Sequence, residues 1–312
     1  MRVVSPPSSA DLDAAWRVVS ARLAPTPLVA APALREGVLL KLESLQPTGS
    51  FKVRGAVAAL AALGDGEVVT ASAGNHGLGV AWAATALGRR ATVVVPETAS
   101  PAKVAALESF DIRLVRHGAG YDEAEAHALE LAAAGSVYVS PYNDTDVIAG
   151  QATIGRELES QLDGPCTVVC PLGGGGLASG LALWAAGRDG TGVVAVEARR
   201  SQAFRAALDA GRIVPIEPGP TVADGLGGNL EPGSVTFDIV RDHVDEVSVA
   251  EEDEIEAAIR FLANHAGLVA EGAAAAAVAA VRAGRVAVAG PIVVVVSGRN
   301  IAASRLAGLL GS

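Results

Sequence analysis

One lysine in this chain stands in a setting that favours covalent chemistry. Lys52 lies in the stretch GSFKVRGA, residues 49 to 56, between small and hydroxylated residues where a helix is expected to begin. A lysine that is desolvated in such a place has a lowered pKa, and its neutral amine becomes a nucleophile toward carbonyl compounds. The alternative is a capped helix with one basic residue in its first turn, which this stretch alone favours, so the decision depends on the other loops.

A second stretch, SAGNHG at residues 72 to 77, follows an apolar strand and directly precedes a predicted helix. Its small residues leave backbone N–H groups open at a helix N-terminus, where a carboxylate or phosphate is favoured. Asn75 adds a side-chain donor suited to a phenolate or carboxylate oxygen, with a helix cap as its alternative role. His76 has two candidate roles, a catalytic base or, as we favour, a residue that orients the loop.

The third stretch contains four consecutive glycines, Gly173, Gly174, Gly175 and Gly176, which follow the predicted strand 167–170 and open another helix. Ordering glycine costs roughly 1 kcal/mol per residue relative to alanine in regular structure. Something must therefore need the bare backbone, and the N–H groups of such a loop form a concave nest for a phosphate. A flexible turn is the alternative.

The glycine loop also satisfies part of the dinucleotide-binding pattern. Gly173, Gly175 and Ala178 have its spacing, and Glu197 ends the next strand, where an acidic residue would contact a ribose. This interpretation explains one loop and leaves the other two without a role. No Lys-Ser or Lys-Thr pair follows the glycines, which disfavours a loop for nucleoside triphosphates.

Strands and helices alternate along the chain, and this alternation positions the three loops. The expected strands are residues 38–42, 67–70, 91–95, 112–115, 137–139, 167–170, 193–196, 247–249 and 292–296. The expected helices are residues 11–23, 53–63, 75–87, 101–110, 121–134, one ending near 161, one ending at 186, 251–264, 273–282 and 302–310. The pattern predicts an α/β fold, with mainly parallel twisted sheets and helices on both faces. Ligands in such sheets lie outside the carboxyl ends of the strands, so the loops directly after strands are the candidate sites.

No internal repeat, low-complexity tail or long linker divides the sequence. A second domain is therefore expected to be inserted into the first rather than to follow it. We place a small mobile domain at residues 68–141 and a large domain, which carries the glycine loop, at residues 1–67 and 142–312.

The composition argues against several classes of protein. Half of the chain is hydrophobic and only 4% is aromatic, and no apolar run reaches the roughly 18 to 20 residues that span a bilayer. The net charge of −10 is spread without a basic block, which disfavours nucleic acid and membranes as partners. Cys166 and Cys170 lack a second ligand pair, so we expect buried thiols and no metal site. The N-terminus has no apolar signal core, and we expect a cytoplasmic protein.

A single ligand with a phosphate, a phenolic oxygen and an aldehyde would use the glycine nest, Asn75 and Lys52 at once. Pyridoxal 5′-phosphate carries these three groups and also a pyridine nitrogen. Ser297, in the stretch SGRN at residues 297 to 300, follows an apolar strand and is a neutral candidate partner for that nitrogen. A hydroxyl partner leaves the ring nitrogen largely unprotonated, which makes the ring a weaker electron sink than a carboxylate partner would.

Taken together, these motifs resemble the fold-type II pyridoxal phosphate enzymes, the tryptophan synthase β-like group, and within it the serine/threonine dehydratases and serine racemases. The similarity covers nearly the whole chain. It lies in KLESLQPTGSFKVRGA (41–56), SAGNHG (72–77), DVIAGQATIGREL (146–158), PLGGGGL (171–177), ADGL (223–226), EGAAAA (271–276) and SGRN (297–300). The resemblance implies a two-lobed fold whose small lobe is inserted into a large, cofactor-binding one.

Carried over position by position, the resemblance makes Lys52 the Schiff-base lysine and the base that removes the α-proton. Asn75 matches the partner of the phenolic oxygen, Gly173 to Gly176 match the phosphate cradle, and Ser297 matches the partner of the pyridine nitrogen. The positions that hold the substrate carboxylate in the family are here Ser72, Asn75 and His76.

The implied activity is β-elimination, the dehydration and deamination of L-threonine, L-serine or a similar β-hydroxy amino acid to an α-keto acid and ammonia. The alternatives are β- or γ-replacement, as in threonine synthase, and serine racemisation. Ala73 stands where racemases of this group have a second serine, and its methyl group cannot exchange a proton. A protein that only stores or carries the cofactor is a further, non-enzymatic alternative.

Other positions bear on cations, regulation and assembly. Glu197 matches the start of the family's divalent-cation site, but Ala203 replaces an acidic ligand there, so we expect no bound metal. Glu271 resembles a glutamate near the family's active site, with a helix-start acid as its alternative role. Since the chain ends just after its last predicted helix, we expect neither the regulatory domain of biosynthetic threonine dehydratases nor feedback by isoleucine. Shorter relatives commonly form homodimers or homotetramers, which are the assemblies we consider for this chain.

Overall fold

Two twisted sheets organise the computed structural model, in which residues 3–286 and 290–311 are described. The strands of the larger sheet are β1 (Leu28–Ala30), β2 (Val38–Lys41), β7 (Thr167–Pro171), β8 (Gly192–Ala198), β9 (Glu246–Ala250) and β10 (Ile292–Val295). Those of the smaller sheet are β3 (Val68–Ala71), β4 (Ala91–Val95), β5 (Arg113–Arg116) and β6 (Val137–Tyr138). The smaller sheet is thus formed by a segment that lies between β2 and β7 in the sequence.

The strand order is β1-β2-β10-β7-β8-β9 in the larger sheet and β5-β4-β3-β6 in the smaller. Within the described residues, β1 and β2 pair in antiparallel fashion and all other neighbouring strands are parallel. The predicted α/β class with mainly parallel sheets is therefore confirmed. Parallel pairing turns the carboxyl ends of β3, β7 and β10, which precede three of the predicted site motifs, to one edge of each sheet.

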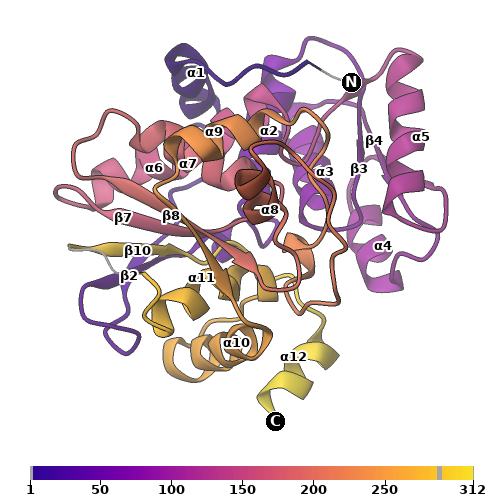
Figure 1. Ribbon diagram of the computed structural model, residues 1–312. Helices are drawn as coiled ribbons and strands as arrows, with labels where there is room; N and C mark the ends of the chain where they lie inside the picture. Colours follow the sequence, from indigo (N-terminus) through magenta and orange to yellow (C-terminus); the bar gives the residue numbers. More distant parts are fainter. Residues whose placement is uncertain (1–2, 287–289, 312) are drawn as a thin grey trace.

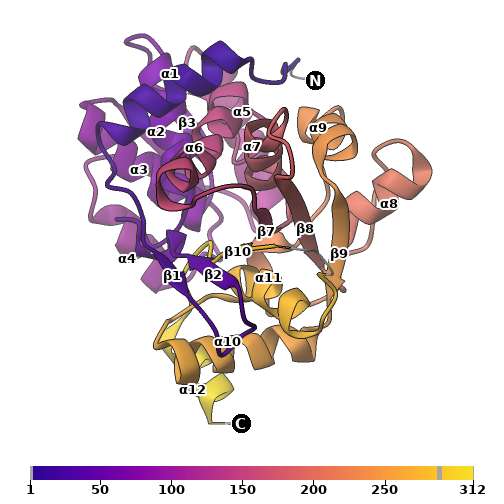
Figure 2. The same cartoon turned by 90° about the vertical axis from the view of Figure 1, so that its left-hand side faces the viewer.

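Helices cover both faces of the larger sheet (Figures 1 and 2), as predicted. In the part of the chain that is described, the helices are α1 (Ser9–Ser20), α2 (Lys52–Ala62), α3 (Asn75–Leu87), α4 (Pro101–Glu108), α5 (Tyr121–Ala133), α6 (Thr145–Gln161), α7 (Gly176–Ala185), α8 (Ala203–Ala210), α9 (Val235–His243), α10 (Glu252–Ala266), α11 (Gly272–Arg282) and α12 (Ala303–Leu310). Short 3₁₀ turns lie at η1 (Glu43–Leu45) and η2 (Asp224–Leu226). In both views α6, α7 and α9 lie on one side of the sheet, and α10 and α11 lie on the other.

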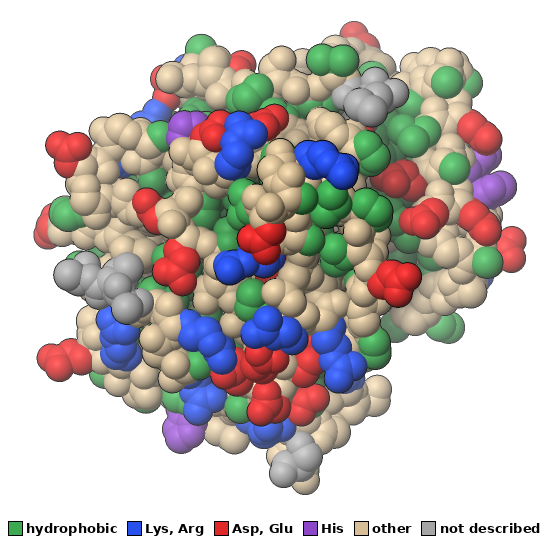
Figure 3. All heavy atoms as spheres, viewed as in Figure 1, with side chains coloured by type: hydrophobic (Ala, Val, Ile, Leu, Met, Phe, Trp, Pro, Cys, Tyr) green, Lys and Arg blue, Asp and Glu red, His purple; other side chains and the backbone are tan. Residues whose placement is uncertain are grey.

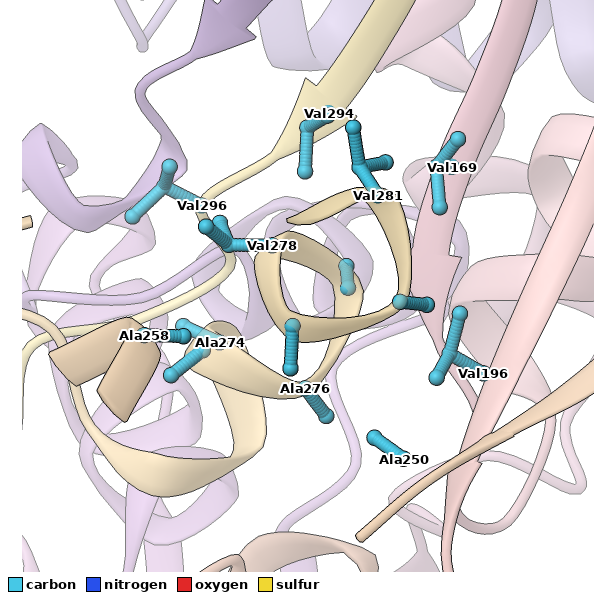
Figure 4. Packing of buried hydrophobic residues seen from close by; sticks show 14 of the residues in the cluster. Val169, Val196, Ala250, Ala258, Ala274, Ala276, Val278, Val281, Val294 and Val296 are labelled. Carbon is cyan, nitrogen blue, oxygen red and sulfur yellow. The ribbon is translucent and has the colours of Figure 1, made fainter. Parts of the chain in front are cut away.

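The core is built on the two faces of the larger sheet. In β10, Ile292 and Val294 pack with α10 and α11, whereas Val293 and Val295 pack with α6 and α7. A strand that is buried on both faces needs apolar residues at every position, which explains why this strand is a continuous apolar run. On one face α11 is buried all round from Gly272 to Val281 and touches valines of β7, β8 and β10 (Figure 4).

Caps explain where the predicted boundaries held and where they shifted. The predicted helix 75–87 and strand 91–95 have these bounds in the structure. The hydroxyl of Ser100 accepts the N–H of Lys103 before α4, with Pro101 in the first helical position. The helix expected near residues 11–23 begins earlier, at Ser9, because Ser8 and Asp11 form a reciprocal capping box.

Three elements escaped sequence reasoning. The strand β1 has three residues whose side chains are mostly exposed, so it shows no apolar run. The segment of α9 alternates polar and apolar residues as a strand does, and its helical state follows from packing of Phe237 and Val240 with α7 and the large sheet. The helix α8 was not assigned, although Phe204 and Ala207 lie one turn apart on its buried face.

Basic and acidic side chains intermingle on the face of the molecule seen in Figure 3. Surface ion pairs such as Arg199 with Glu251, at 2.7 Å, are one consequence of this mixing. Among the described residues, no helix combines the length and the apolar character that crossing a membrane requires.

Candidate active site

Lys52 begins α2, and backbone pairing with the segment after β10 holds it there. The N–H of Phe51 donates to the carbonyl oxygen of Ser297 at 3.0 Å, and Ser50 forms an isolated bridge with Gly298. Phe51, the N-cap residue, makes no side-chain cap, and the buried hydroxyl of Ser50 has no partner among the described residues. The capped-helix alternative for this stretch is therefore wrong.

The Lys52 side chain is half-buried, and its amine is turned toward the carboxyl end of β6. Its Nζ donates to the backbone carbonyl of Pro141 at 2.7 Å. Burial lowers the pKa of Lys52 to about 8, and the nearby carboxyl of Glu271 opposes that shift only in part. At neutral pH a larger fraction of this amine is therefore unprotonated than in a surface lysine. The unprotonated amine is the form that acts as a nucleophile.

Helix α3 packs directly on the backbone of Lys52. A Cβ atom at Gly79 would lie 3.1 Å from the carbonyl carbon of Lys52, closer than an ordinary side-chain contact. The absence of a side chain at Gly79 therefore lets the loop that precedes α3, residues 72–74, approach the lysine. Sequence reasoning did not single out this glycine, because nothing local distinguishes it from other helical glycines.

The stretch 72–77 at the start of α3, here called the anion loop, has backbone N–H groups without an acceptor among the described residues. Ser72 accepts the N–H of Gly74 through its hydroxyl at 3.1 Å, which tightens the turn. A Cβ at Gly77 would come within 2.1 Å of the carbonyl oxygen of Ser72, so the loop folds back on itself only with glycine there. Within the described part of the chain, the backbone N–H groups of Asn75, His76 and Gly77 donate no hydrogen bond. These amides at the start of a helix form the expected kind of seat for a carboxylate.

The Asn75 side chain is held by two residues from distant parts of the sequence. Its Nδ2 donates to Glu271 Oε1 at 2.7 Å, and its Oδ1 accepts from Asn300 Nδ2 at 2.6 Å. Asn300 also donates to the carbonyl oxygen of Thr48 at 2.8 Å. The N-cap residue of α3 is Gly74, and it has no side-chain cap. The helix-cap alternative for Asn75 is therefore wrong.

Glu271 is the residue whose role the sequence left open. It is the N-cap of α11, yet its carboxylate makes no cap and instead accepts from Asn75. Burial raises the pKa of Glu271 to about 7, against the opposing effect of the hydrogen bond from Asn75. Its own N–H donates to the carbonyl of Gly298 at 3.1 Å. The start of α11 is thus joined to the SGRN segment beside Lys52.

His76 is buried and anchors the anion loop to the end of β6. Its Nε2 lies 3.1 Å from the carbonyl oxygen of Val139, so Nε2 carries the proton and donates it. Burial, and then the charge of Lys52, lower the pKa of His76 to about 3. The ring is neutral and a very weak base, which favours orientation of the loop over proton abstraction.

The glycine loop after β7 also has unpaired donors. Among the described residues, the backbone N–H groups of Gly173, Gly174 and Gly175 donate no hydrogen bond. Gly175 has φ +89°, a backbone conformation that residues with a side chain rarely adopt. A Cβ at Gly174 would lie 2.2 Å from the Tyr142 ring. Packing against Tyr142 therefore fixes the loop from one side, which does not fit the flexible turn kept as an alternative.

A short segment missed by sequence reasoning links the glycine loop to the lysine. Tyr142 packs on Gly174, while its neighbour Pro141 accepts the hydrogen bond from Lys52. The available signal was its position, since PYNDTD (141–146) begins three residues after the end of β6. Ser297 completes the group: it is buried, with 1% of its surface exposed, and its carbonyl joins the start of α2.

Glu197 lies near the end of β8, and its hydrogen bonds go to α8. Its carboxylate accepts the N–H groups of Phe204 and Arg205 at 2.8 and 3.0 Å, at the start of α8. Since that carboxylate is engaged in capping a helix, it does not serve as the ribose partner that the dinucleotide interpretation requires. No cluster of three or more His, Cys, Asp or Glu side chains suited to a metal occurs among the described residues.

The donors at this site fit pyridoxal 5′-phosphate. An amine of lowered pKa suits its aldehyde, the unpaired amides of the glycine loop suit its phosphate, and the Asn75 amide suits its phenolic oxygen. Comparison with known proteins points to the same cofactor, because residues 19–298 match the family described as pyridoxal-phosphate dependent enzymes. The chain belongs to this family. Pyridoxal phosphate is its cofactor, and the dinucleotide interpretation is wrong.

Members of known sequence and structure resemble the chain over most of its length. An L-threonine ammonia-lyase of Thermotoga maritima is 42% identical over 85% of this chain and 67% of that protein. Maize serine racemase superposes with a TM-score of 0.91 at 28% identity, over 97% of each chain. The processed form of threonine deaminase isoform 2 from Solanum lycopersicum gives 0.88 at 32% identity, over 100% of this chain and 96% of that one. The resemblance to the fold-type II enzymes stated from the motifs is thereby confirmed.

Proposed function

We propose that this enzyme is an ammonia-lyase that converts L-threonine, L-serine or a similar β-hydroxy amino acid to an α-keto acid and ammonia. The observation that carries the proposal is the Lys52 amine, with its pKa lowered to about 8, beside the open amides of the anion loop. Relatives named L-threonine ammonia-lyase, at 42% and 40% identity, support the same reaction.

In this proposal Lys52 holds the cofactor aldehyde, Asn75 the phenolic oxygen, the loop Gly173–Gly176 the phosphate, and Ser297 the pyridine nitrogen. When bound, pyridoxal phosphate supplies an electron sink for the electron pair that is left when the α-proton is removed. The neutral hydroxyl of Ser297 makes that sink weak, which favours early loss of the β-hydroxyl over reactions that need a persistent carbanion.

The chain's own groups divide the remaining work. Lys52 Nζ, once free, takes the α-proton as general base, and its lowered pKa matches that task. The substrate carboxylate is held by Ser72 and by the open backbone amides of Asn75, His76 and Gly77 at the start of α3. His76, being neutral, holds the loop through Val139 rather than supplying a positive charge.

Ala73 favours elimination over racemisation. Its methyl group packs with the apolar cluster around Val93 and Leu107 and carries no proton that could be exchanged with a substrate carbon. A racemase needs a second acid on the face opposite Lys52, and the proposal includes none. Replacement chemistry, as in threonine synthase, remains the alternative, because it shares the first proton transfer.

The proposal extends to the organisation of the chain. Residues 68–141 form a small mobile domain and residues 1–67 and 142–312 the cofactor-binding one, which is supported by a separate sheet that runs from β3 to β6. A cytoplasmic location and a homodimer or homotetramer complete the proposal, and both rest on the sequence.

Assaying keto acid from L-threonine and L-serine tests this function. We expect production by the wild type and none above background by Lys52→Ala, which removes both the covalent anchor and the base. Absence of keto acid from the wild type would refute the lyase. Accumulation of a replacement product with an added nucleophile, or of D-serine from L-serine, would favour the respective alternative.

A further inference from the structure

The orientation of the Asn75 amide can be traced back to a backbone carbonyl. The carbonyl oxygen of Thr48 can only accept, so the atom of Asn300 that faces it at 2.8 Å must be the nitrogen. That same nitrogen lies 2.6 Å from Asn75, which must therefore present its oxygen. The Asn75 nitrogen then faces Glu271 at 2.7 Å, where a carboxylate accepts its proton.

These hydrogen bonds engage three of the four N–H groups of the Asn75 and Asn300 side-chain amides. Asn300 Nδ2 carries two hydrogens, and Thr48 and Asn75 take one each. Asn75 Nδ2 also carries two, of which Glu271 takes one. Among the described residues no acceptor takes the second hydrogen, which is the one side-chain donor that Asn75 retains. Without the two partners, rotation of the amide by half a turn would place an acceptor there instead.

We propose that Glu271 and Asn300 are positioning residues that fix the Asn75 amide so that its remaining N–H serves the phenolic oxygen of the cofactor. The inference rests on the proposed role of Asn75 and extends it to two residues that act through it. Glu271 acts here as an acceptor, and its charge is not required. Asn300 acts as a donor whose own orientation is set by Thr48.

Cofactor affinity tests the proposal without any turnover. The full chain, stripped of cofactor, is titrated with pyridoxal 5′-phosphate, and the absorption maximum of the bound cofactor is recorded as a second readout. In Asn300→Asp, two acceptors face Thr48 and Asn75, so the amide loses its anchor. We expect about tenfold weaker binding and a shifted maximum, since one hydrogen bond of about 1.4 kcal/mol is lost.

A double-mutant cycle separates positioning from a general effect. In an Asn75→Ala background there is no amide to orient, so Asn300→Asp should change affinity by less than about twofold. An equal loss in both backgrounds would overturn the proposal, because Asn300 would then act by another route. Thermal melting of each cofactor-free variant shows whether it is folded.

Substitutions at Glu271 give an independent test if Asn300→Asp does not fold. Glu271→Gln keeps an oxygen that can accept from Asn75 and should retain affinity and spectrum, whereas Glu271→Leu keeps the size and loses the acceptor. If Gln impairs binding as much as Leu does, the role is one of charge and the proposal is wrong. Borohydride reduction followed by mass analysis of the Lys52 peptide in the wild type detects failure of the proposed function itself.

Discussion

The amine of Lys52 and the carboxyl of Glu271 have pKa values moved toward neutrality by the same cause. Each is removed from water, which lowers the pKa of the lysine to about 8 and raises that of the glutamate to about 7. A group whose pKa lies near the working pH can exchange a proton readily in either direction. The two shifted pKa values and the hydrogen bonds of Asn75 set the residues around Lys52 apart from the exposed ion pairs of the surface.

Capture of the cofactor should depend on pH through Lys52. The neutral amine is the nucleophile, and it becomes the major form as pH rises through about 8. We therefore expect the rate of pyridoxal phosphate uptake by the cofactor-free chain to rise between about pH 7 and 9 and then level off. Stopped-flow absorbance measures this rate. A rate that still climbs steeply beyond pH 10, as for an exposed lysine, would contradict the low pKa.

Lys52 is the first residue of α2, and a buried network of ion pairs through Arg54 holds the same helix. Arg54 pairs with Glu43 at 2.7 Å and with Glu157 at 2.7 Å, and Lys41 also pairs with Glu157, all with side chains at most 2% exposed. The network joins β2, η1, α2 and α6. Burial alone would raise the pKa of Glu43, but the guanidinium of Arg54 holds it below its usual value.

Breaking this network should cost stability. Glu157→Gln leaves Lys41 and Arg54 buried with one carboxylate fewer, and loss of a buried partner costs about 3–5 kcal/mol. Chemical denaturation of the cofactor-free chain measures the change. As a control, Asp209→Asn removes an exposed pair with Arg205 at 3.6 Å and should change the free energy of unfolding by less than about 1 kcal/mol. Equal effects would refute the assigned importance of the buried pairs.

The contact between α3 and α2 can be tested at its closest point. Gly79→Ala would place a Cβ 3.1 Å from the Lys52 backbone, so the start of α2 and α3 must move apart by a few tenths of an ångström. We expect destabilisation by about 1–3 kcal/mol together with a raised KM for the amino acid. Gly308→Ala in α12 is the matched control, since its Cβ would meet nothing within 4 Å. There we expect unchanged KM and a gain of up to about 1 kcal/mol.

At the scale of the whole molecule, the two sheets meet where the chain passes between them. His76 reaches Val139 and Lys52 reaches Pro141, so both contacts lie just after β6, where the chain leaves the smaller sheet. A ligand carboxylate bound at the start of α3 would therefore pull on the smaller sheet as a unit. This arrangement suits a small domain that closes over the substrate.

Closure should be visible by hydrogen exchange. L-Alanine has an amino acid carboxylate but no β-hydroxyl to lose, so it can occupy the site without elimination. We expect it to slow exchange in the cofactor-loaded enzyme at residues 72–77 and 139–142. The strand β9 (Glu246–Ala250), at the edge of the larger sheet beyond β8, serves as the internal control and should not change. Protection spread evenly over the chain would argue against a closing domain.

The sequence by itself determined the fold class and the three loops, because these depend on local information. Apolar runs, glycines and caps act on neighbouring residues. The order of strand β7, glycine loop and helix α7 could therefore be predicted. The motif around Lys52 was likewise contiguous. Boundaries shifted where a cap lay outside the apolar pattern, as with Ser8 before α1.

Only the tertiary structure decided how Asn75 is used. Its two partners, Glu271 and Asn300, lie 196 and 225 positions away in the sequence. Local pattern allowed a helix cap for Asn75 and for Glu271, and neither side chain acts as one. The physical reason is that a half-buried amide or a buried carboxylate takes whichever partner the fold brings within about 3 Å. For these residues that partner comes from another part of the chain.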